Sequence, residues 1–252
     1  MRVLAFASQK GGSGKTTLSA HMAVQAERAG AGPVVLVDTD PQGSLSEWWN
    51  DRESEMPAFA RTTTGRLLSD LDDLRTRGFK LAVIDTPPAI TMAIQAVVVV
   101  ADMVVIPTRP SPHDLRAAGA TVDLVENADK PLMFVINAAS PRAKITSDAA
   151  IALSQHGTVA PTIVHNRTVF ASSMIDGRTV MEVDPSSTSS KEIDALWDYI
   201  AQAEIGQSPP VCGFQFLIIE SGQKPCGQCL PICLVELDES AREVPPASFA
   251  KH

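Results

Sequence analysis

The length, composition and charge of the chain narrow the class of protein to which it can belong. Its 252 residues suffice for one large α/β domain with a sizeable core, and 44% of them are hydrophobic but only 5% aromatic, which favours alanine- and valine-rich layers. The net charge of −8 argues against a dedicated DNA-binding module, because such modules are usually basic, so any DNA contact must come from a local cluster of cations.

The first predicted elements are a strand at residues 3–7, a glycine-rich loop at 8–17 and a helix that starts near Lys15. This is the context of a phosphate-binding loop. Glycines leave no Cβ in the way, so successive N–H groups can face phosphate oxygens, and the helix N-terminus adds its own unpaired N–H groups. Lys15 supplies charge for the β- and γ-phosphates, and the Thr16 hydroxyl is placed to ligate Mg²⁺. The predicted nucleotide-binding residues here are Gly11, Gly12, Ser13, Gly14, Lys15, Thr16 and Thr17.

Acidic residues close the next two predicted strands. Asp38 ends one apolar run, Asp40 follows two residues later, and Asp85 ends the next apolar run. Unbroken apolar runs are typical of parallel strands buried on both faces, and the carboxyl ends of such strands meet at one crevice. Asp85 therefore fits a Mg²⁺ site, bound through water beside Thr16. For Asp38 and Asp40, an ordinary Asx-Pro turn is the alternative.

The rest of the first 204 residues alternates between predicted strands and helices. The strands are 102–107, 131–137 and 159–164, and the helices are 66–77, 93–100, 113–127, 144–156 and 186–203. Such βα alternation predicts an α/β fold with a doubly wound, mostly parallel sheet flanked by helices, the Rossmann-like three-layer arrangement of P-loop NTPases.

Some side chains are expected in the core or at a helix end. Ser111 is expected to cap helix 113–127, and one of Trp48 and Trp49 is expected to pack in the core. A stripe of leucines at helical spacing is predicted to face the core, namely Leu67, Leu68, Leu71 and Leu74.

Three motifs resemble, in the same order, those of the ParA/MinD family of ATPases. Residues 10–16 read K-G-G-x-G-K-T, with a second lysine at the start, and are similar to the deviant Walker A loop of that family. Residues 38–43, D-x-D-P-Q-G, resemble the second signature of ParA proteins, and residues 85–88, D-T-P-P, resemble the switch that senses the γ-phosphate. The resemblance covers about residues 1–204 and is closest to the ParA-type partition ATPases.

The resemblance implies roles for individual residues and ATP with Mg²⁺ as cofactors. Lys10 would reach across a dimer interface to the nucleotide of the other subunit, Asp40 would orient the attacking water, and Asp38 would support the Mg²⁺ shell. Positioning of this kind suits phosphoryl transfer. Asn137 lies where family members contact the base, although a simple turn residue is equally open. The implied catalytic residues are Lys10, Lys15 and Asp40, and the implied Mg²⁺ ligands are Thr16, Asp38 and Asp85.

The resemblance also implies partners. Members of the family form a homodimer on ATP binding, the dimer binds DNA non-specifically on the nucleoid, and a ParB- or ParG-like partner stimulates hydrolysis. Phosphate neutralisation would come from clustered cations. Candidates are Arg142, Lys144, Arg167 and Arg178, of which Arg167 and Arg178 are expected to carry most of the binding; solvated surface charges are the alternative. An ATPase that positions an enzyme complex instead of DNA would share every motif.

Residues 206–252 lack a counterpart in the family pattern and are expected to form a poorly ordered tail after the ATPase domain of residues 1–205. The tail holds all four cysteines, Cys212, Cys226, Cys229 and Cys233. Their spacing could hold Zn²⁺ or an iron–sulfur cluster, which makes a cluster carrier or assembly ATPase of the same superfamily the alternative function. The absence of cysteine from the first 211 residues fits a reducing compartment.

We expect a cytoplasmic protein without a membrane role. Lys10 interrupts the N-terminal apolar run too early for a signal peptide. The longest apolar run, residues 93–107, contains Asp102 and is too short to span a bilayer. The tail holds too few basic residues for an amphipathic membrane-binding helix.

Overall fold

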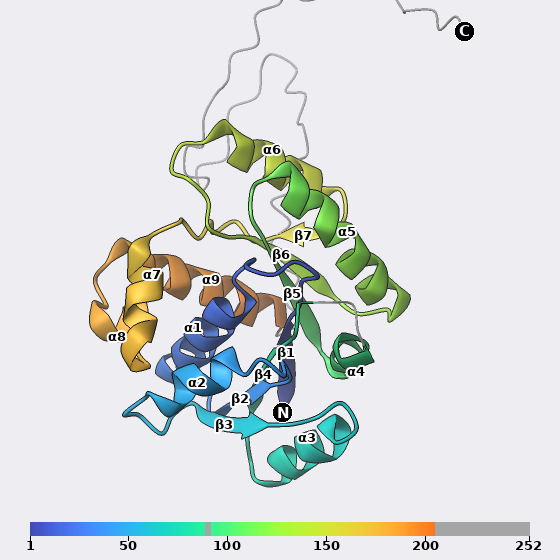
Figure 1. Ribbon diagram of the computed structural model, residues 1–252, viewed down its shortest axis with the longest axis vertical. Helices are drawn as coiled ribbons and strands as arrows, with labels where there is room; N and C mark the ends of the chain where they lie inside the picture. The colour runs from blue at the N-terminus through green and yellow to red at the C-terminus, as the bar shows by residue number, and fades with distance from the viewer. Residues whose placement is uncertain (89–91, 205–252) are drawn as a thin grey trace, which may run out of the picture. The chain divides into compact units, whose positions relative to one another are not determined.

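The computed structural model describes residues 1–88 and 92–204. Parallel strands form one sheet of seven, in the order β3-β2-β4-β1-β5-β6-β7 (Figure 1). The strands are β1 (Arg2–Phe6), β2 (Val34–Asp38), β3 (Ala58–Arg61), β4 (Leu81–Asp85), β5 (Met103–Thr108), β6 (Leu132–Ile136) and β7 (Thr158–Val159). The predicted doubly wound parallel sheet is confirmed.

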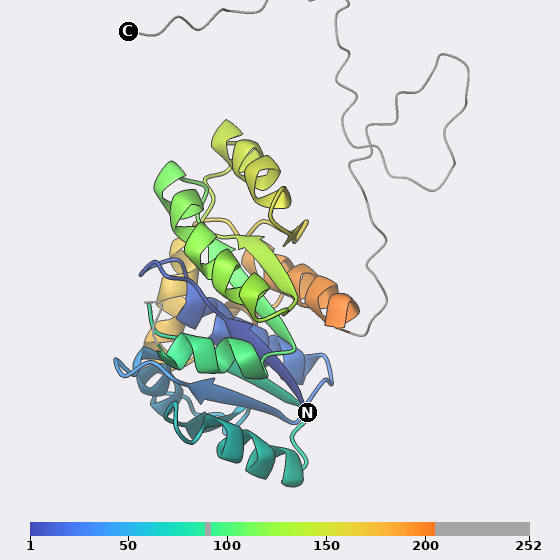
Figure 2. The same cartoon turned by 90° about the vertical axis from the view of Figure 1, so that its right-hand side faces the viewer.

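Helices cover both faces of this sheet (Figures 1 and 2). One face carries α1 (Lys15–Arg28), α2 (Ser44–Asn50), α7 (Thr168–Ser173), α8 (Val180–Val183) and α9 (Thr188–Glu204). The other face carries α3 (Leu67–Thr76), α4 (Met92–Val100), α5 (Pro112–Asn127) and α6 (Lys144–Ser154). A 3₁₀ turn, η1 (Met174–Asp176), joins α7 to the segment before α8.

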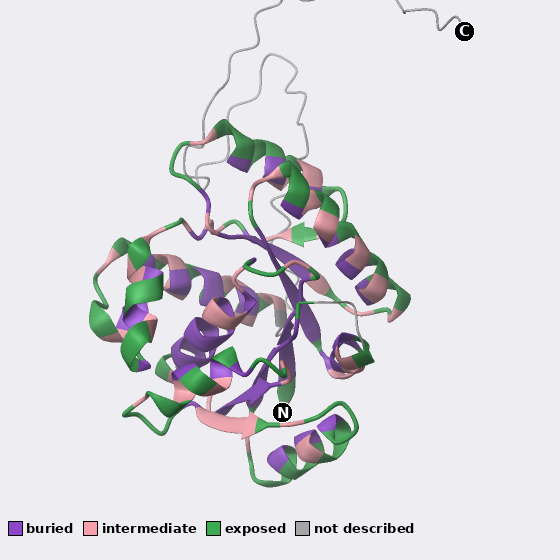
Figure 3. Cartoon of the chain, viewed as in Figure 1, coloured by how far each residue is buried: buried purple, intermediate pink, exposed green. Residues whose placement is uncertain are grey.

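The strands are apolar on both sides because each side packs against helices. In β1, Leu4 and Phe6 belong to the cluster under α1 and α9, whereas Val3 and Ala5 belong to the opposite cluster. Figure 3 shows the central strands as buried and the outer faces of the helices as exposed. Burial on both faces explains why the sequence of these strands shows no alternation of polar and apolar residues.

The strand order places the crevice at the carboxyl end of β1. The chain passes from β1 through α1 to β2 on one side, and from β4 through α4 to β5 on the other. Ligands bind at such a reversal of strand order in open α/β sheets. No helix within residues 1–88 and 92–204 has both the length and the apolar character needed to cross a bilayer.

Three expectations from the sequence need correction. Strand β3 was not predicted, since it is a short edge strand of half-exposed residues. Strand β7 has two residues where 159–164 was expected, because Pro161 lacks an N–H and the segment bonds to β6 beyond Val159 only through the N–H groups of Ala160 and Val164. Leu68 is 66% exposed, so the core stripe of α3 consists of Leu67, Leu71 and Leu74 alone.

The expectations for the tryptophans and the cap are confirmed. Trp48 is buried in the core, while Trp49 is half-buried and stacks on Phe59 with ring centroids 5.3 Å apart. Ser111 is the N-cap of α5 and accepts a hydrogen bond from the Asp114 N–H. The predicted tail and its four cysteines lie outside the described residues.

Candidate nucleotide-binding site

The loop between β1 and α1 has the backbone that an anion requires. Gly12 and Gly14 take φ values of 74° and 99°, which L-residues with a side chain rarely adopt. Gly14 is also the N-cap of α1, and no side chain caps this end or places an acid in its first turn. The first N–H groups of α1 are therefore open to an anionic ligand, and the helix dipole favours one.

Lys15 lies at this helix end with a side chain that is only 6% exposed. Its ammonium group, Nζ, donates to the backbone carbonyl of Lys10 at 3.4 Å. Burial lowers the pKa of Lys15, while the charges of Asp85 and Asp40 oppose that shift. An ammonium group held in a dry site without a full set of partners gains more from a phosphate than one in open water.

Asp85 stands beside the next residue of the helix. Thr16 Oγ1 donates to Asp85 Oδ2 at 2.6 Å, and the other oxygen, Oδ1, is buried without a hydrogen-bond partner among the described residues. Burial raises the pKa of Asp85 to about 7, against the hydrogen bond from Thr16. A buried carboxylate oxygen that lacks a donor is suited to a cation or to a water bound to one.

Asp38 is paired in register with Asp85 across β2 and β4. It is buried, and its carboxylate accepts hydrogen bonds from the Asp40 N–H at 2.9 Å, the Ser46 N–H at 3.1 Å and the Ser46 hydroxyl at 2.7 Å. These bonds fix the turn after β2 and the first turn of α2. Asp38 therefore holds the loop that carries Asp40.

Asp40 projects from this turn and is half-exposed. Its Oδ1 accepts from the Gln42 N–H at 2.9 Å, which closes the Asx turn that the sequence left open as an alternative. This turn is compatible with a catalytic position for Asp40, because the Asp40 carboxylate is close enough to Lys15 for its charge to raise the pKa of that lysine.

The residues present fit Mg²⁺ held jointly with a nucleotide. The Thr16 hydroxyl and the unpartnered oxygen of Asp85 are the hard oxygen ligands that Mg²⁺ prefers. Within residues 1–88 and 92–204, no three His, Cys, Asp or Glu side chains gather into a metal site. The remaining ligands would come from phosphate oxygens and water, as is usual for Mg²⁺.

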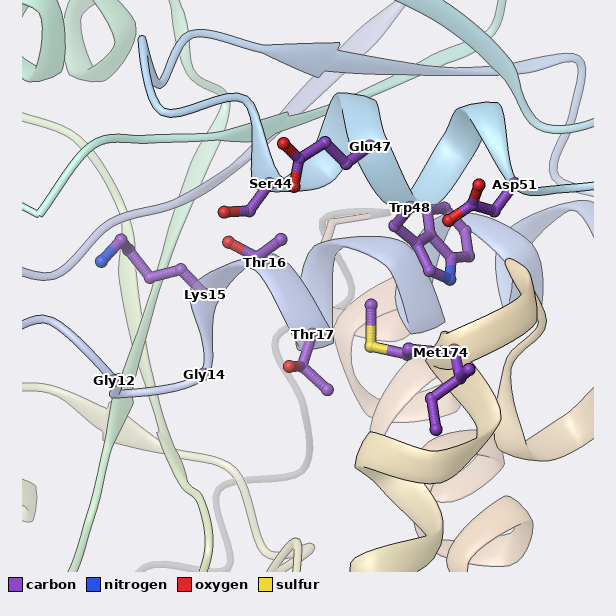
Figure 4. Close-up of a pocket in the computed structure, with 11 residues that line it drawn as sticks. Gly12, Gly14, Lys15, Thr16, Thr17, Ser44, Glu47, Trp48, Asp51 and Met174 are labelled. Atoms are coloured by element: carbon purple, nitrogen blue, oxygen red, sulfur yellow. The ribbon is translucent and has the colours of Figure 1, made fainter.

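A pocket of about 560 Å³ opens beside the loop (Figure 4). One wall is the phosphate loop with the start of α1, and the other is formed by α2 and η1. The lining residues are Gly12, Gly14, Lys15, Thr16, Thr17, Ser44, Glu47, Trp48, Asp51, Met174 and Ile175. Figure 4 shows Thr16 beside Ser44 and Thr17 facing Met174. The volume is that of an ordinary small-molecule site.

The wall made by α2 is joined to the segment after η1. The Arg52 side chain is 2% exposed and lies over the Trp48 ring at 4.8 Å. Its guanidinium donates to the Gly177 carbonyl at 2.6 Å and to Glu182 Oε1 at 2.8 Å. These contacts tie the C-terminal end of α2 to residues 177–182.

Two predicted site residues make contacts that the sequence did not indicate. Asn137 Nδ2 donates to the Ser13 carbonyl at 2.7 Å, so its amide supports the phosphate loop. Lys10 Nζ contacts Asp114 Oδ2 at 2.6 Å within the same chain. Gly11 is part of the loop, and a Cβ on it would meet only Pro88, at 3.9 Å.

The four candidate DNA-binding cations are not equivalent. Arg167 pairs with Glu192 at 2.5 Å and Arg178 pairs with Asp176 at 2.6 Å. Arg142 and Lys144 are exposed at the start of α6, and neither forms an ion pair with any residue that the structure describes. The ion pairs partly neutralise Arg167 and Arg178.

Sequence reasoning missed Ser46 and Asp114, and it also missed several residues that line the pocket, namely Ser44, Glu47, Asp51, Met174 and Ile175. Asp114 stands three residues after the Ser111 cap, a spacing that predicts a local contact at a helix start. No local signal indicates the contact between Asp114 and Lys10, because the two residues are far apart in the chain.

Comparison with known proteins identifies relatives of the chain. Residues 4–180 match the CobQ/CobB/MinD/ParA nucleotide binding domain family. A relative from Halothiobacillus neapolitanus, "Maintenance of carboxysome distribution protein A", is 32% identical over 205 residues, which cover 75% of this chain and 91% of the relative.

Solved structures show the same fold. An ATP complex of McdA from Cyanothece has a TM-score of 0.63 and 16% identity, over 84% of this chain and 98% of that one. The septum site-determining protein MinD from Pyrococcus horikoshii, complexed with Mg-ADP, has a TM-score of 0.67 and 15% identity, over 83% and 99% of the two chains. The chain therefore belongs to the CobQ/CobB/MinD/ParA family and is a P-loop ATPase of the ParA/MinD type.

Proposed function

We propose that the protein is a positioning ATPase that dimerises around Mg²⁺-ATP. The observation that carries the proposal is the juxtaposition of an uncapped helix start at Gly14 with Thr16 hydrogen-bonded to a buried carboxylate, Asp85. The first accepts phosphates, and the second fits the magnesium ion that accompanies them. The relative from H. neapolitanus, whose name refers to carboxysome distribution, supports a positioning role.

The phosphate loop and the three carboxylates of the site each have a part in this proposal. The N–H groups of residues 11–17 and the Lys15 ammonium bind the phosphates, and Thr16 with Asp85 would hold Mg²⁺, which would supply positive charge for the phosphates. Asp38 supports that shell and fixes the turn through its bonds to Ser46 and to the Asp40 N–H. Asp40 orients the attacking water.

Lys10 completes the site of the second subunit in the ATP-bound homodimer. ATP shifts the population toward the dimer, and hydrolysis to ADP returns single chains. A ParB- or ParG-like partner stimulates hydrolysis. We place the dimer on the nucleoid of the cytoplasm, where it binds DNA without sequence preference.

Arg142 and Lys144 carry the larger share of DNA binding in this proposal. A phosphate contact by Arg167 or Arg178 must compete with Glu192 or Asp176, whereas Arg142 and Lys144 have no carboxylate within ion-pair distance among the described residues. Neutralising a phosphate with a free cation costs no existing ion pair.

The relatives favour a protein assembly as the cargo that this ATPase positions. The name of the H. neapolitanus relative refers to the distribution of a carboxysome, not to a plasmid. A DNA cargo, as in plasmid or chromosome partition, is the second candidate, and the family to which the chain belongs includes ParA. The partner bound by the purified ATPase distinguishes the two.

The first experiment is binding to non-specific duplex DNA across a salt series, with ATP and with ADP. Binding with ATP alone that weakens steeply with salt supports the proposed cycle. Absence of binding in both states moves the function toward the iron–sulfur alternative. That alternative is tested by anaerobic reconstitution with iron and sulfide, followed by visible spectra of the full chain and of residues 1–205.

A further inference from the structure

The start of the phosphate loop is attached to helix α5 at two points. The Gln9 N–H donates to Thr121 Oγ1 at 3.2 Å, and Lys10 Nζ contacts Asp114 Oδ2 at 2.6 Å. Thr121 and Asp114 are about two turns apart and share one face of the helix. The loop therefore lies along one side of α5 before it turns toward the site.

Asp114 is held in place to receive a cation. Its side chain is 6% exposed, and the Ser111 hydroxyl donates to the same oxygen that Lys10 contacts. Burial opposes ionisation, but the bonds from Lys10 and Ser111 outweigh it and hold the pKa of Asp114 below its usual range. A nearly buried carboxylate that lost its contacting cation would be less well compensated, so the pair resists separation.

The backbone of Lys10 also contacts the other lysine of the loop. Lys15 Nζ donates to the carbonyl of Lys10 at 3.4 Å, so the backbone of Lys10 is held while its side chain pairs with Asp114. The Lys10 side chain is 39% exposed and can leave Asp114 without passing through packed core.

A second cation, Arg109, lies near enough to Asp114 for its charge to act on that carboxylate. Arg109 is exposed, and it forms no ion pair within residues 1–88 and 92–204. Its guanidinium lies against the phosphate loop, with Nη2 3.8 Å from the position of a Cβ on Gly12, and its charge acts on Asp114. When Lys10 leaves, Arg109 compensates part of the carboxylate charge from beyond ion-pair distance.

We propose that Asp114 is a positioning residue of the ATPase cycle that retains Lys10 on α5 of its own chain. Lys10 must exchange Asp114 for the nucleotide of a second copy, so the ion pair raises the ATP concentration at which the dimer forms. This inference rests on the proposed function in one respect, namely that Lys10 completes the opposite site.

Chemical labelling tests the ion pair without reference to dimerisation. The full chain without nucleotide is pulsed with acetic anhydride, and acetylation of Lys10 is followed by mass spectrometry relative to Lys80. Asp114→Asn should raise the rate at Lys10 about threefold or more, because a free amine is more accessible than a paired one. Asp123→Asn, an exposed acid on the same helix, is the matched control and should change nothing. An unchanged rate in Asp114→Asn overturns the proposal.

Dimerisation tests the consequence. Sedimentation of the full chain across an ATP titration should show the Asp114→Asn dimer at about threefold less ATP, which a merely structural role of Asp114 would not produce. Lys10→Ala should prevent the dimer at every ATP concentration, and adding Asp114→Asn should not restore it. Dimer formation by the double variant overturns the proposal.

The labelling and sedimentation experiments together distinguish failure of the proposed function from failure of the inference about Asp114. If the wild-type chain forms no dimer with ATP, the proposed function fails, and the role of Asp114 in dimerisation fails with it. If the wild type dimerises but Asp114→Asn changes neither labelling nor the ATP requirement, only the inference about Asp114 is wrong.

Discussion

A single methyl group is enough to disturb the phosphate loop. Gly14 has a φ of 99°, and a Cβ built on it would lie 2.1 Å from Asn137 Nδ2. The Asn137 amide in turn holds the Ser13 carbonyl. The glycine was predicted from its motif, and Asn137 was expected at the site from the family resemblance, but the packing of Asn137 against Gly14 could be identified only after folding.

Gly14→Ala should therefore weaken ATP binding about tenfold or more. The added Cβ must displace Asn137 and holds a backbone conformation that costs an alanine at least ~1 kcal/mol. Titration of a fluorescent ATP analogue measures the loss. Gly119→Ala is the matched control, since a Cβ there meets nothing within 4 Å and the residue lies inside α5. Equal affinities for both variants would contradict the close packing of the loop.

Asp40→Ala should retain ATP binding and dimer formation but lower the hydrolysis rate about a hundredfold or more. Its carboxylate projects from a turn that Asp38 fixes, so its removal leaves the phosphate loop and Asp85 in place. Phosphate release under single-turnover conditions measures the rate, and sedimentation with ATP measures the dimer. Loss of ATP binding in this variant would refute the role of Asp40 in positioning the water.

At the scale of elements, the central strands were predictable because burial on both faces leaves a long apolar run in the sequence. Strand β3 lacked that signal, since it lies at the sheet edge with half-exposed residues. The stripe of α3 was overestimated because Leu68 follows Leu67 directly and so points about 100° away from it around the helix. The carboxylate that pairs with Lys10 could not be predicted from the sequence, because the contact joins a loop to a helix that is distant in the chain.

Helices α1 and α8 are joined through His21, whose ring is buried. Its Nδ1 bonds to the Thr17 carbonyl at 2.7 Å, and its Nε2 accepts from the Val180 N–H at 3.2 Å. An Nε2 that accepts requires a neutral ring with its proton on Nδ1. Burial accordingly lowers the pKa of His21 from 6.5 to about 4.

This shift makes stability depend on pH. The unfolded chain binds a proton on His21 below pH 6.5, whereas the folded chain binds it only below about pH 4. The contribution of His21 therefore lowers the free energy of unfolding by about 3 kcal/mol as the pH falls through that window. Asp85 acts in the opposite sense, since its raised pKa makes stability fall as the pH rises from 3.8 to about 7. The effect of His21 is therefore visible only as a difference between variants.

Urea unfolding at pH 7 and pH 4.5 should separate the two contributions. In His21→Gln, the change in unfolding free energy between the two pH values should lack the ~2 kcal/mol that His21 contributes to the wild type between pH 7 and pH 4.5. The exposed His156→Gln variant should follow the wild type. If His21→Gln and the wild type change in parallel, His21 is protonated in the folded protein.

For the whole molecule, the net charge of −8 means that DNA is attracted only locally. Arg142→Ala with Lys144→Ala should reduce the slope of log affinity against log salt by about 2 and weaken ATP-dependent DNA binding. Arg167→Ala with Arg178→Ala should reduce it less, because both cations already contact carboxylates. If the slope falls more in the Arg167→Ala, Arg178→Ala variant, these two arginines carry most of the DNA binding, as the family resemblance implies.

Hydrogen bonds attach both ends of the short helix α2 to other parts of the structure. In its first turn, Ser46 donates to the carboxylate of Asp38. After its last turn, the Arg52 side chain donates to Gly177 and Glu182. Helix α2 thus links the turn after β2 to residues 177–182 through hydrogen bonds at both of its ends. A change in the position of the Asp38 turn is therefore expected to move residues 177–182 with it.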